Sequence, residues 1–285
     1  MKFGIGTAQF NKNYGILKTN VNKSEFKKII NKFNKKIDLI DTASSYGGSE
    51  KFIGNNCNKK YKIITKLDKI KSKRSDIIIN EINHKLKNSL KNLKSKNVYC
   101  LLIHSEADIK LFNNKKIKNY INILKKKKII KKIGISIYDI SKLNNYLKVY
   151  DFDIVQIPLN IFSINNNIIE KLRKLKKKYK FEIHVRSIFF QGIIFKNLKN
   201  LPRVVKHLKK NISVLHENSK IYNTTVYNYA ISSIDNLKIA EYAIIGISNN
   251  KDFIKLKKYK KVKINKIDIE KTSTNNLLID LRKLK

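Results

Sequence analysis

The sequence predicts an α/β fold, a (β/α)8 TIM barrel that takes up residues 1–285 as a single domain. Short β-branched runs alternate with Lys-rich amphipathic segments along the whole chain, as in parallel strands joined by crossover helices. The length of 285 residues fits this fold, since such barrels commonly run about 250 residues. The chain has only two prolines and no Pro/Gly/Ser-rich linker, so nothing divides it into two domains.

Eight apolar runs are the predicted strands, and eight parallel strands are enough to close a barrel. They cover residues 3–6, 38–41, 62–65, 98–103, 132–135, 154–157, 182–185 and 242–245. Helical patterns lie between them, at residues 24–34, 75–93, 115–127, 140–146, 167–179, 202–219, 225–231 and 251–257. The long stretch 191–223 is predicted to carry an extra loop before its helix.

Composition narrows the class of protein. Hydrophobic residues make up 42% of the chain, which supports a sizeable core. No run approaches the roughly 20 apolar residues of a membrane span, and the N-terminus lacks a signal-peptide pattern, so we expect a cytoplasmic protein. The two cysteines, Cys57 and Cys100, and the histidines show no metal-ligand spacing, so neither a metal nor a disulfide framework is expected.

The net charge of +42 raises the question of a polyanionic partner. The lysines are spread over almost every predicted helix and are accompanied by many Asn and Ile residues, a pattern typical of an AT-rich coding sequence. We therefore expect no specific nucleic-acid partner, only nonspecific adhesion at low salt. A functional polyanion-binding surface is the alternative.

Polar side chains follow consecutive predicted strands at the end where a (β/α)8 barrel carries its chemistry. Asp41 ends the second strand, Lys66 follows the third, His104 follows the fourth, and Tyr46 lies in the loop after Asp41. These residues would converge at the mouth of one barrel. A lysine beside a phenol lowers its pKa, an aspartate keeps the lysine charged, and an imidazole orients a carbonyl oxygen. This set of residues makes an acid for carbonyl reduction.

These segments carry a family resemblance. IDTASSYGGSEKFIG resembles the signature of the aldo-keto reductase family, in its bacterial branch, and ITKL and LLIHS are similar to that family's lysine and histidine strands. GISIY, VQIPLN, VRSIFFQG and IIGISNN follow in the family's order, so the resemblance runs from Gly4 to about Asn250. The chain has no GxGxxG fingerprint, which argues against a Rossmann dehydrogenase.

The resemblance implies an NAD(P)H-dependent enzyme that reduces a small-molecule aldehyde or ketone, with Asp41, Tyr46, Lys66 and His104 as the catalytic residues. Tyr46 would donate the proton, with Lys66 lowering its pKa. The implied cofactor contacts are Thr7, Ser136, Gln156, Arg186, Ser187, Gly246 and Ser248. Of these, Ser136 and Gln156 match positions that bind the nicotinamide carboxamide, while Ser187 and Gly246 match the loops around the pyrophosphate and adenosine.

The sequence departs from the family pattern at three places. Ile137 follows Ser136 where asparagine is common. Arg186 stands where many members place an aromatic ring, so it either stacks on the nicotinamide or meets an anionic group of the substrate. Asp252 falls near the usual arginine for the 2′-phosphate, with Lys251 as a possible substitute. Family habit favours NADP(H), and NAD(H) is the alternative.

The substrate is less determined than the chemistry. The segment GTAQFNKNYG resembles family members from sugar-modification contexts, which implies a sugar-derived carbonyl, and Gln9 and Tyr14 could line its pocket or simply pack on the barrel rim. A second hypothesis keeps the barrel and the cofactor but makes the protein a regulatory or redox-sensing subunit without turnover. The sequence predicts neither the oligomeric state nor the direction of the reaction.

Overall fold

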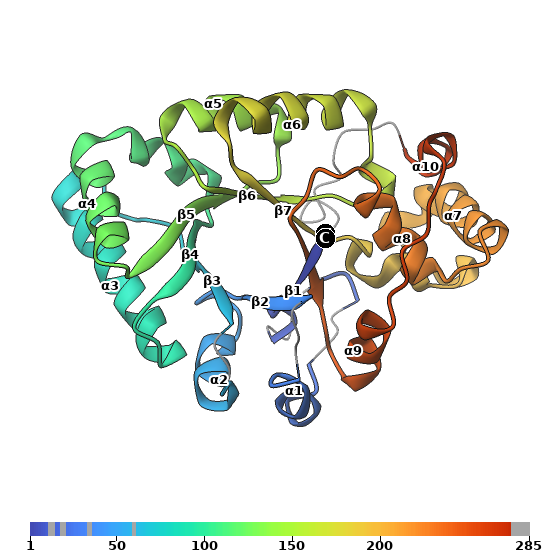
Figure 1. Cartoon of the computed structure of the whole chain (residues 1–285), viewed down its shortest axis with the longest axis horizontal. Helices are drawn as coiled ribbons and strands as arrows, with labels where there is room; N and C mark the ends of the chain where they lie inside the picture. The colour runs from blue at the N-terminus through green and yellow to red at the C-terminus, as the bar shows by residue number, and fades with distance from the viewer. Residues whose placement is uncertain (11–14, 18–20, 33–35, 59–60, 275–285) are drawn as a thin grey trace.

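The computed structural model describes residues 1–10, 15–17, 21–32, 36–58 and 61–274. Eight parallel strands form a closed barrel in sequence order, as Figure 1 shows. All eight predicted strands are confirmed, with ends within two residues of those expected. The strands are β1 Lys2–Gly6, β2 Ile37–Asp41, β3 Lys62–Leu67, β4 Val98–Ile103, β5 Ile130–Ser136, β6 Ile154–Pro158, β7 Glu182–Arg186 and β8 Tyr242–Gly246.

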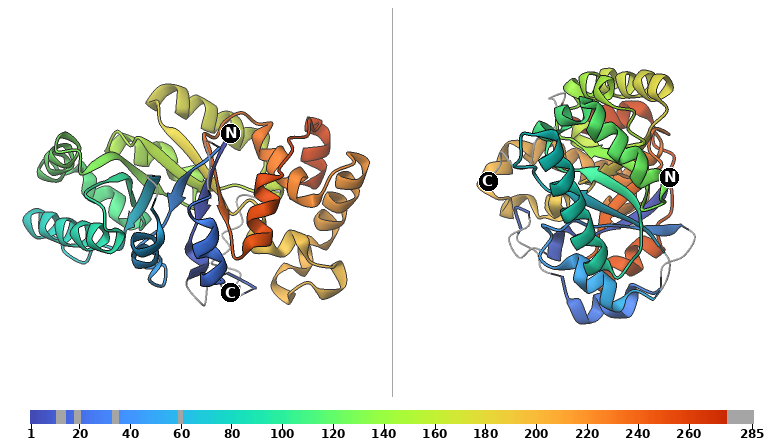
Figure 2. Two further views of the ribbon diagram at one scale, coloured as in Figure 1. Left: turned by 60° about the horizontal axis from the view of Figure 1, so that its bottom comes forward. Right: turned by 90° about the vertical axis from the view of Figure 1, so that its left-hand side faces the viewer.

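Helices surround the barrel, with α3 and α4 on one side and α7 to α10 on the other (Figures 1 and 2). Their apolar stripes pack on the outer face of the strands, as the sequence pattern requires. The helices are α1 Lys23–Ile29, α2 Ser49–Asn56, α3 Ser75–Leu93, α4 Lys115–Lys126, α5 Leu143–Val149, α6 Asn166–Tyr179, α7 Lys209–Ile221, α8 Val226–Asp235, α9 Asn250–Lys257 and α10 Lys266–Thr272.

Helix α2 is missing from the sequence prediction, and the reason is local. It begins after Gly48, whose φ of 80° places it in the left-handed region, and it buries Ser49, Glu50 and Ile53. Since two of these three are polar, the helix has no apolar stripe to reveal it. Helix α10 was likewise not predicted.

Several predicted helices have different ends in the structure. The predicted helix 140–146 begins as a 3-10 segment, Ile140–Lys142, and continues as α5 to Val149, and the predicted helix 225–231 continues to Asp235 as α8. The predicted helix 202–219 is split into a 3-10 segment, Arg203–Leu208, and helix α7. The predicted helix 24–34 ends at Ile29 as α1, and its residues 33 and 34 lie outside the described part of the chain.

The barrel interior is filled by side chains from alternate strand positions. Near the start of the strands lies a polar floor, where the Lys62 ammonium donates to the Tyr242 hydroxyl at 2.7 Å and that hydroxyl donates to Asp38 at 2.9 Å. Above it lies an apolar cluster of Leu39, Ile64, Cys100, Leu102, Ile154 and Ile244. This packed interior separates the floor from the carboxyl ends of the strands, where the candidate site lies.

The barrel wall is least complete between its last two strands. Strands β6 and β7 pair at five positions from Ile154 to Pro158, whereas β7 and β8 pair only at His184 with Tyr242 and Val185 with Ala243. Beyond these two pairs β7 and β8 are not paired with each other, and residues of the connections that follow them line the pocket described below.

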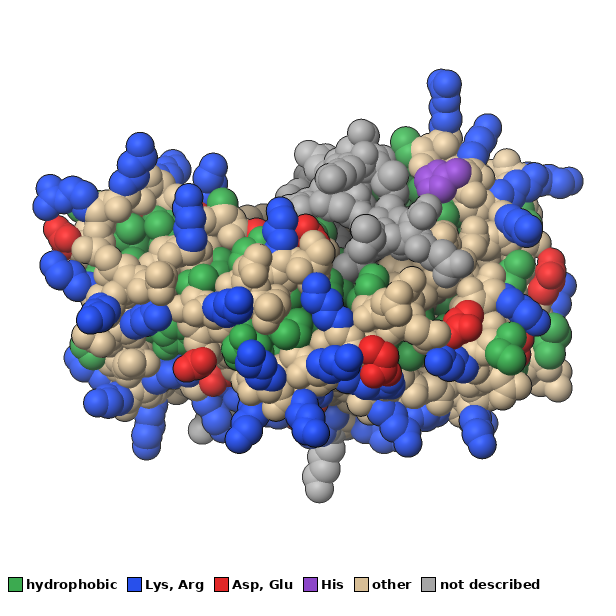
Figure 3. Space-filling model, turned by 90° about the horizontal axis from the view of Figure 1, so that it is seen from above, with side chains coloured by type: hydrophobic (Ala, Val, Ile, Leu, Met, Phe, Trp, Pro, Cys, Tyr) green, Lys and Arg blue, Asp and Glu red, His purple; other side chains and the backbone are tan. Residues whose placement is uncertain are grey.

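The surface carries the positive charge broadly. Figure 3 shows lysine and arginine side chains over the whole visible face, among few carboxylates and in no single patch. Within the described ranges, no helix is both long enough and apolar enough to cross a membrane.

Candidate active site

A buried ion pair anchors the site. The Lys66 ammonium lies 2.6 Å from Asp41 Oδ1, and their side chains are 1% and 6% exposed. The other carboxylate oxygen of Asp41 accepts from the Gln156 amide at 2.7 Å, and Lys66 also donates to the Thr42 carbonyl at 3.0 Å. Because adjacent strands deliver Asp41 and Lys66, the pair is fixed by the barrel itself.

The other two predicted catalytic residues lie beside this pair. The Lys66 ammonium sits over the Tyr46 ring, 4.7 Å from its centre. The rings of Tyr46 and His104 meet edge to face with their centres 5.9 Å apart. The structure therefore brings Asp41, Tyr46, Lys66 and His104 together at the carboxyl end of the barrel.

The sequence predicts that Lys66 lowers the pKa of Tyr46, whereas in the structure the net shift of the Tyr46 pKa is upward. Loss of hydration on burial raises the pKa of Tyr46 well above its usual value, and the Asp41 carboxylate raises it further. Lys66 faces the ring and pairs with Asp41. Arg186 is a cation that opposes the rise. Tyr46 therefore stays protonated, which is the state that a proton donor needs.

Asp68 is a site residue that the sequence reasoning missed. Its carboxylate lies 3.4 Å from His104 Nδ1 and accepts from the Ser44 hydroxyl. Burial alone would raise the pKa of Asp68, but the hydrogen bonds from His104 and Ser44 outweigh it and hold the pKa below its usual value. The signal was its position directly after β3, which ends at Leu67, because residues that follow barrel strands gather at the carboxyl end of the barrel.

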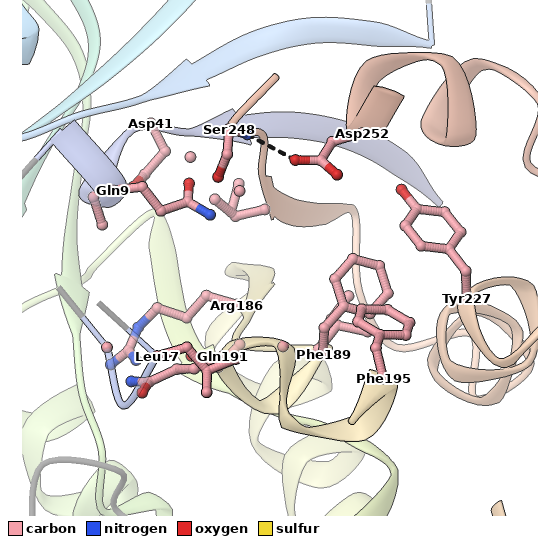
Figure 4. A pocket seen from close by; sticks show the side chains of 18 of the residues that line it. Gln9, Leu17, Asp41, Arg186, Phe189, Gln191, Phe195, Tyr227, Ser248 and Asp252 are labelled. Carbon is pink, nitrogen blue, oxygen red and sulfur yellow. Dashed lines mark hydrogen bonds between the residues drawn. The ribbon is translucent and has the colours of Figure 1, made fainter. Parts of the chain in front are cut away.

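A pocket of about 250 Å³ opens beside Tyr46 and extends to the residues that follow β7 and β8. Figure 4 shows Asp41 on one side of it and Tyr227 and Asp252 on the other. We call the part at Asp41 and Tyr46 the catalytic end. The distal end is the part lined by Phe189, Phe195, Tyr227, Ser248 and Asp252.

The predicted cofactor residues divide into two groups. Those that line the pocket are Arg186, Ser187, Gly246 and Ser248. The others are buried behind it: the Thr7 hydroxyl donates to the Asp41 carbonyl at 3.1 Å, and the Ser136 hydroxyl lies 3.5 Å from the Gln156 amide oxygen. In the structure Gln156 thus supports Asp41.

Arg186 has one face covered. Its guanidinium lies over the Tyr138 ring, 4.1 Å from the ring centre, and donates to the Ile137 carbonyl at 3.3 Å. Held in this way, it adds positive charge to the wall of the pocket near Tyr46. The geometry is compatible with either role predicted for it.

The connection after β7 has an unusual backbone. Ser187, Phe190 and Gln191 have φ values of 62°, 47° and 55°, in the left-handed region that costs non-glycine residues energy. The Gln191 side chain accepts from the Ile16 amide at 2.8 Å, which holds residues 15–17 against this connection. Leu17 and Gln191 lie together at the edge of the pocket in Figure 4.

The pocket fits a nucleotide cofactor on its own chemistry. Gln9 Oε1 and Tyr227 Oη line it, are buried, and have no hydrogen-bond partner among the described residues. Gly246 admits the Gln9 amide, because a Cβ atom there would lie 2.5 Å from Gln9 Nε2. Such unpaired polar atoms beside aromatic rings suit a ligand with hydroxyl groups and a planar base. His, Cys, Asp and Glu side chains form no group able to hold a metal ion in the described part of the chain.

Comparison with known proteins agrees with this geometry. The sequence model of the Aldo/keto reductase family matches residues 2–268. None of the curated protein sequences compared with the chain matches it significantly.

Solved structures share the fold. The aldo-keto reductase AKR11C1 from Bacillus halodurans, in its holo form, superposes with a TM-score of 0.74 at 15% identity, covering 99% of this chain and 95% of that one. The glycerol dehydrogenase AKR11B4 from Gluconobacter oxydans gives a TM-score of 0.70 at 16% identity, covering 95% and 89%. Because the family match spans nearly the whole chain, this protein belongs to the aldo/keto reductase family and is an NAD(P)-dependent oxidoreductase.

Proposed function

We propose that the protein reduces the carbonyl group of an aldehyde or ketone with Tyr46 as the proton donor. The observation that carries this proposal is the position of the Tyr46 phenol, which lines the pocket next to Lys66 and His104. The bound nicotinamide supplies the hydride equivalent. The Tyr46 hydroxyl supplies the proton, which passes to the carbonyl oxygen as the alcohol forms.

The charges around Tyr46 act on the transition state more than on the ground state. Tyr46 is neutral before the reaction and gains negative charge as its proton leaves. Lys66, 4.7 Å from the ring centre, and Arg186 then become favourable neighbours. Interactions that strengthen only in the transition state are those that accelerate a reaction. Asp41 and Gln156 contribute by holding Lys66 in place.

His104 and its neighbours shape the substrate side. Its ring lies against Tyr46, and its Nδ1 faces Asp68, so Nε2 is the nitrogen available to a carbonyl oxygen. Asp68 and Ser44 add hydrogen-bonding groups suited to a hydroxylated substrate, which supports a sugar-derived carbonyl. Of the two residues expected to line such a pocket, Gln9 does so, and Tyr14 lies outside the described residues.

The test is Tyr46→Phe, measured against a panel of aldehydes, ketones and sugar-derived carbonyls. We expect kcat to fall by about 10³-fold, since a positioned acid contributes on the order of 10² to 10⁴. Dinucleotide binding, measured by calorimetry, should stay unchanged because the hydroxyl acts on the substrate. Tyr120→Phe on helix α4 is the matched control and should leave both quantities unchanged. Full activity in Tyr46→Phe would exclude this proton donor.

The alternative of a regulatory barrel has its own outcome. Tight dinucleotide binding by the wild-type protein, with no reduction of any carbonyl in the panel and a stable partner in a pull-down, would favour it over catalysis.

A further inference from the structure

The distal end of the pocket carries aromatic rings and a carboxylate, and these groups bear on whether NAD(H) or NADP(H) binds. If the reactive ring of a dinucleotide lies at Tyr46, as the proposed function requires, the rest of the same molecule must extend along the pocket. Figure 4 shows Phe189, Tyr227 and Asp252 across the pocket from Asp41. The adenosine half of the coenzyme would therefore occupy the distal end.

Aromatic rings at the distal end suit a planar base. The rings of Phe189 and Tyr227 have their centres 4.6 Å apart, and those of Phe195 and Tyr227 lie nearly parallel at 6.3 Å. A planar base stabilises its binding by stacking on such rings. The Tyr227 hydroxyl, which has no partner among the described residues, points towards Asp252 in Figure 4. Space between these two polar groups suits the hydroxyls of a ribose.

The backbone N–H groups at the start of helix α9 determine whether the distal end can bind the 2′-phosphate of NADP(H). Helix N-termini bind phosphate through free backbone N–H groups. Here the N–H of Ser248 donates to the Asp252 carboxylate at 2.9 Å, and the N–H of Asn250 donates to the Glu25 carboxylate at 2.7 Å. The N–H of Asp252 donates to the Asn249 side chain at 3.0 Å. Three N–H groups are therefore already taken, two of them by negative charges.

Lys251 does not reverse this balance. It lies on the exposed side of the first turn of α9, where water and salt weaken an ion pair with a phosphate. Asp252, in contrast, lines the pocket itself, where a carboxylate repels an added phosphate more strongly because less water screens it.

We propose that Asp252 is a specificity-determining residue that accepts hydrogen bonds from an unphosphorylated adenosine ribose, so that the protein prefers NAD(H) to NADP(H). This inference rests on the proposed function, because it assumes a nicotinamide coenzyme in the pocket. A carboxylate that receives the ribose 2′-hydroxyl is a known physical solution to the same selection on other folds. The family habit that favours NADP(H) is overridden here by the two carboxylates, Asp252 and Glu25, at the start of α9.

The test is calorimetric titration with NADH and NADPH, without substrate. We expect wild-type protein to bind NADH at least about tenfold more tightly than NADPH. Asp252→Asn removes the charge and keeps an oxygen for the Ser248 N–H, so it should shift this ratio by about tenfold towards NADPH. Glu25→Gln is the matched control, because Glu25 caps the same helix but does not line the pocket, and its shift should be smaller. Asp252→Ser provides a second variant with the same expected direction.

Equal or tighter binding of NADPH by the wild-type protein would overturn the preference, and so would an unchanged ratio in both Asp252 variants. Either result would leave the role of Tyr46 untouched, since the dinucleotide would still bind. Conversely, full carbonyl reduction by Tyr46→Phe would remove the proposed donor and leave the coenzyme ratio as measured.

Discussion

The two ends of the pocket differ in how completely their polar groups are paired. At the catalytic end, both oxygens of Asp41 and the ammonium of Lys66 have partners, and all three residues involved come from strands. At the distal end, the Tyr227 hydroxyl is buried without a partner among the described residues, and the backbone of the β7 connection carries positive φ values. The buried ion pair of the first end is paired within the protein, whereas the second end keeps a polar group that a ligand could bind.

This difference separates stability from binding. A fully paired network holds catalytic groups in one geometry, and it is costly to break. Unpaired polar atoms and residues in the left-handed region lower the stability of the protein. They are found at sites where binding a ligand offsets this loss. Substitutions at the two ends should therefore change the free energy of unfolding in opposite directions.

The largest effect is expected for Lys66→Met, which leaves Asp41 buried without its cation. Breaking a buried ion pair from one side costs about 3–5 kcal/mol. We expect that loss in the free energy of unfolding, measured by urea denaturation, along with loss of carbonyl reduction. Lys62→Met on the same strand is the matched control: its ammonium is partly exposed and pairs with Asp38, so about 1 kcal/mol is expected. Equal losses of unfolding free energy in the two variants would mean that the buried pair of Lys66 and Asp41 contributes no more stability than the exposed pair of Lys62 and Asp38.

The same contrast explains what the sequence could predict. Asp41, Lys66 and His104 each end a β-branched run, and barrel topology then brings neighbouring strand ends together. Their proximity therefore follows from local pattern and connectivity alone. The upward shift of the Tyr46 pKa does not follow from local pattern, because it depends on burial and on Arg186, which is far away in the sequence.

The distal end was less predictable because its residues come from connections with no regular pattern. The rings of Phe189 and Tyr227 are in contact although a long, irregular stretch of chain separates them. Ser187 and Gln191 have left-handed backbone conformations although neither is glycine, so the residue types do not predict these conformations. Asp252 was noticed in the sequence, but its bond to the Ser248 N–H appears only in the structure.

A smaller, opposite effect is expected for Tyr227→Phe. It removes a buried hydroxyl that lacks a partner, so the free energy of unfolding without added coenzyme should rise by about 1 kcal/mol. Dinucleotide binding should weaken, because the ribose loses a hydrogen-bonding group. Tyr146→Phe is the control, since that hydroxyl donates to Glu106 at 3.1 Å and its loss should lower stability instead. A fall in stability for Tyr227→Phe would show that its hydroxyl is already paired.

The smallest expected effect is the response of the catalytic step to alkaline pH. The pKa of Tyr46 is raised above the ordinary tyrosine value of about 10, so the donor keeps its proton throughout the range below that value. A donor is lost only as pH rises through its own pKa. The single-turnover rate of reduction, with coenzyme and substrate saturating, should therefore change less than about twofold between neutral pH and about pH 10. Recovery of full activity on return to neutral pH controls for unfolding. A tenfold fall per pH unit that begins well below pH 10 would contradict this expectation. It would indicate that Lys66 lowers the pKa of the Tyr46 phenol more than burial raises it.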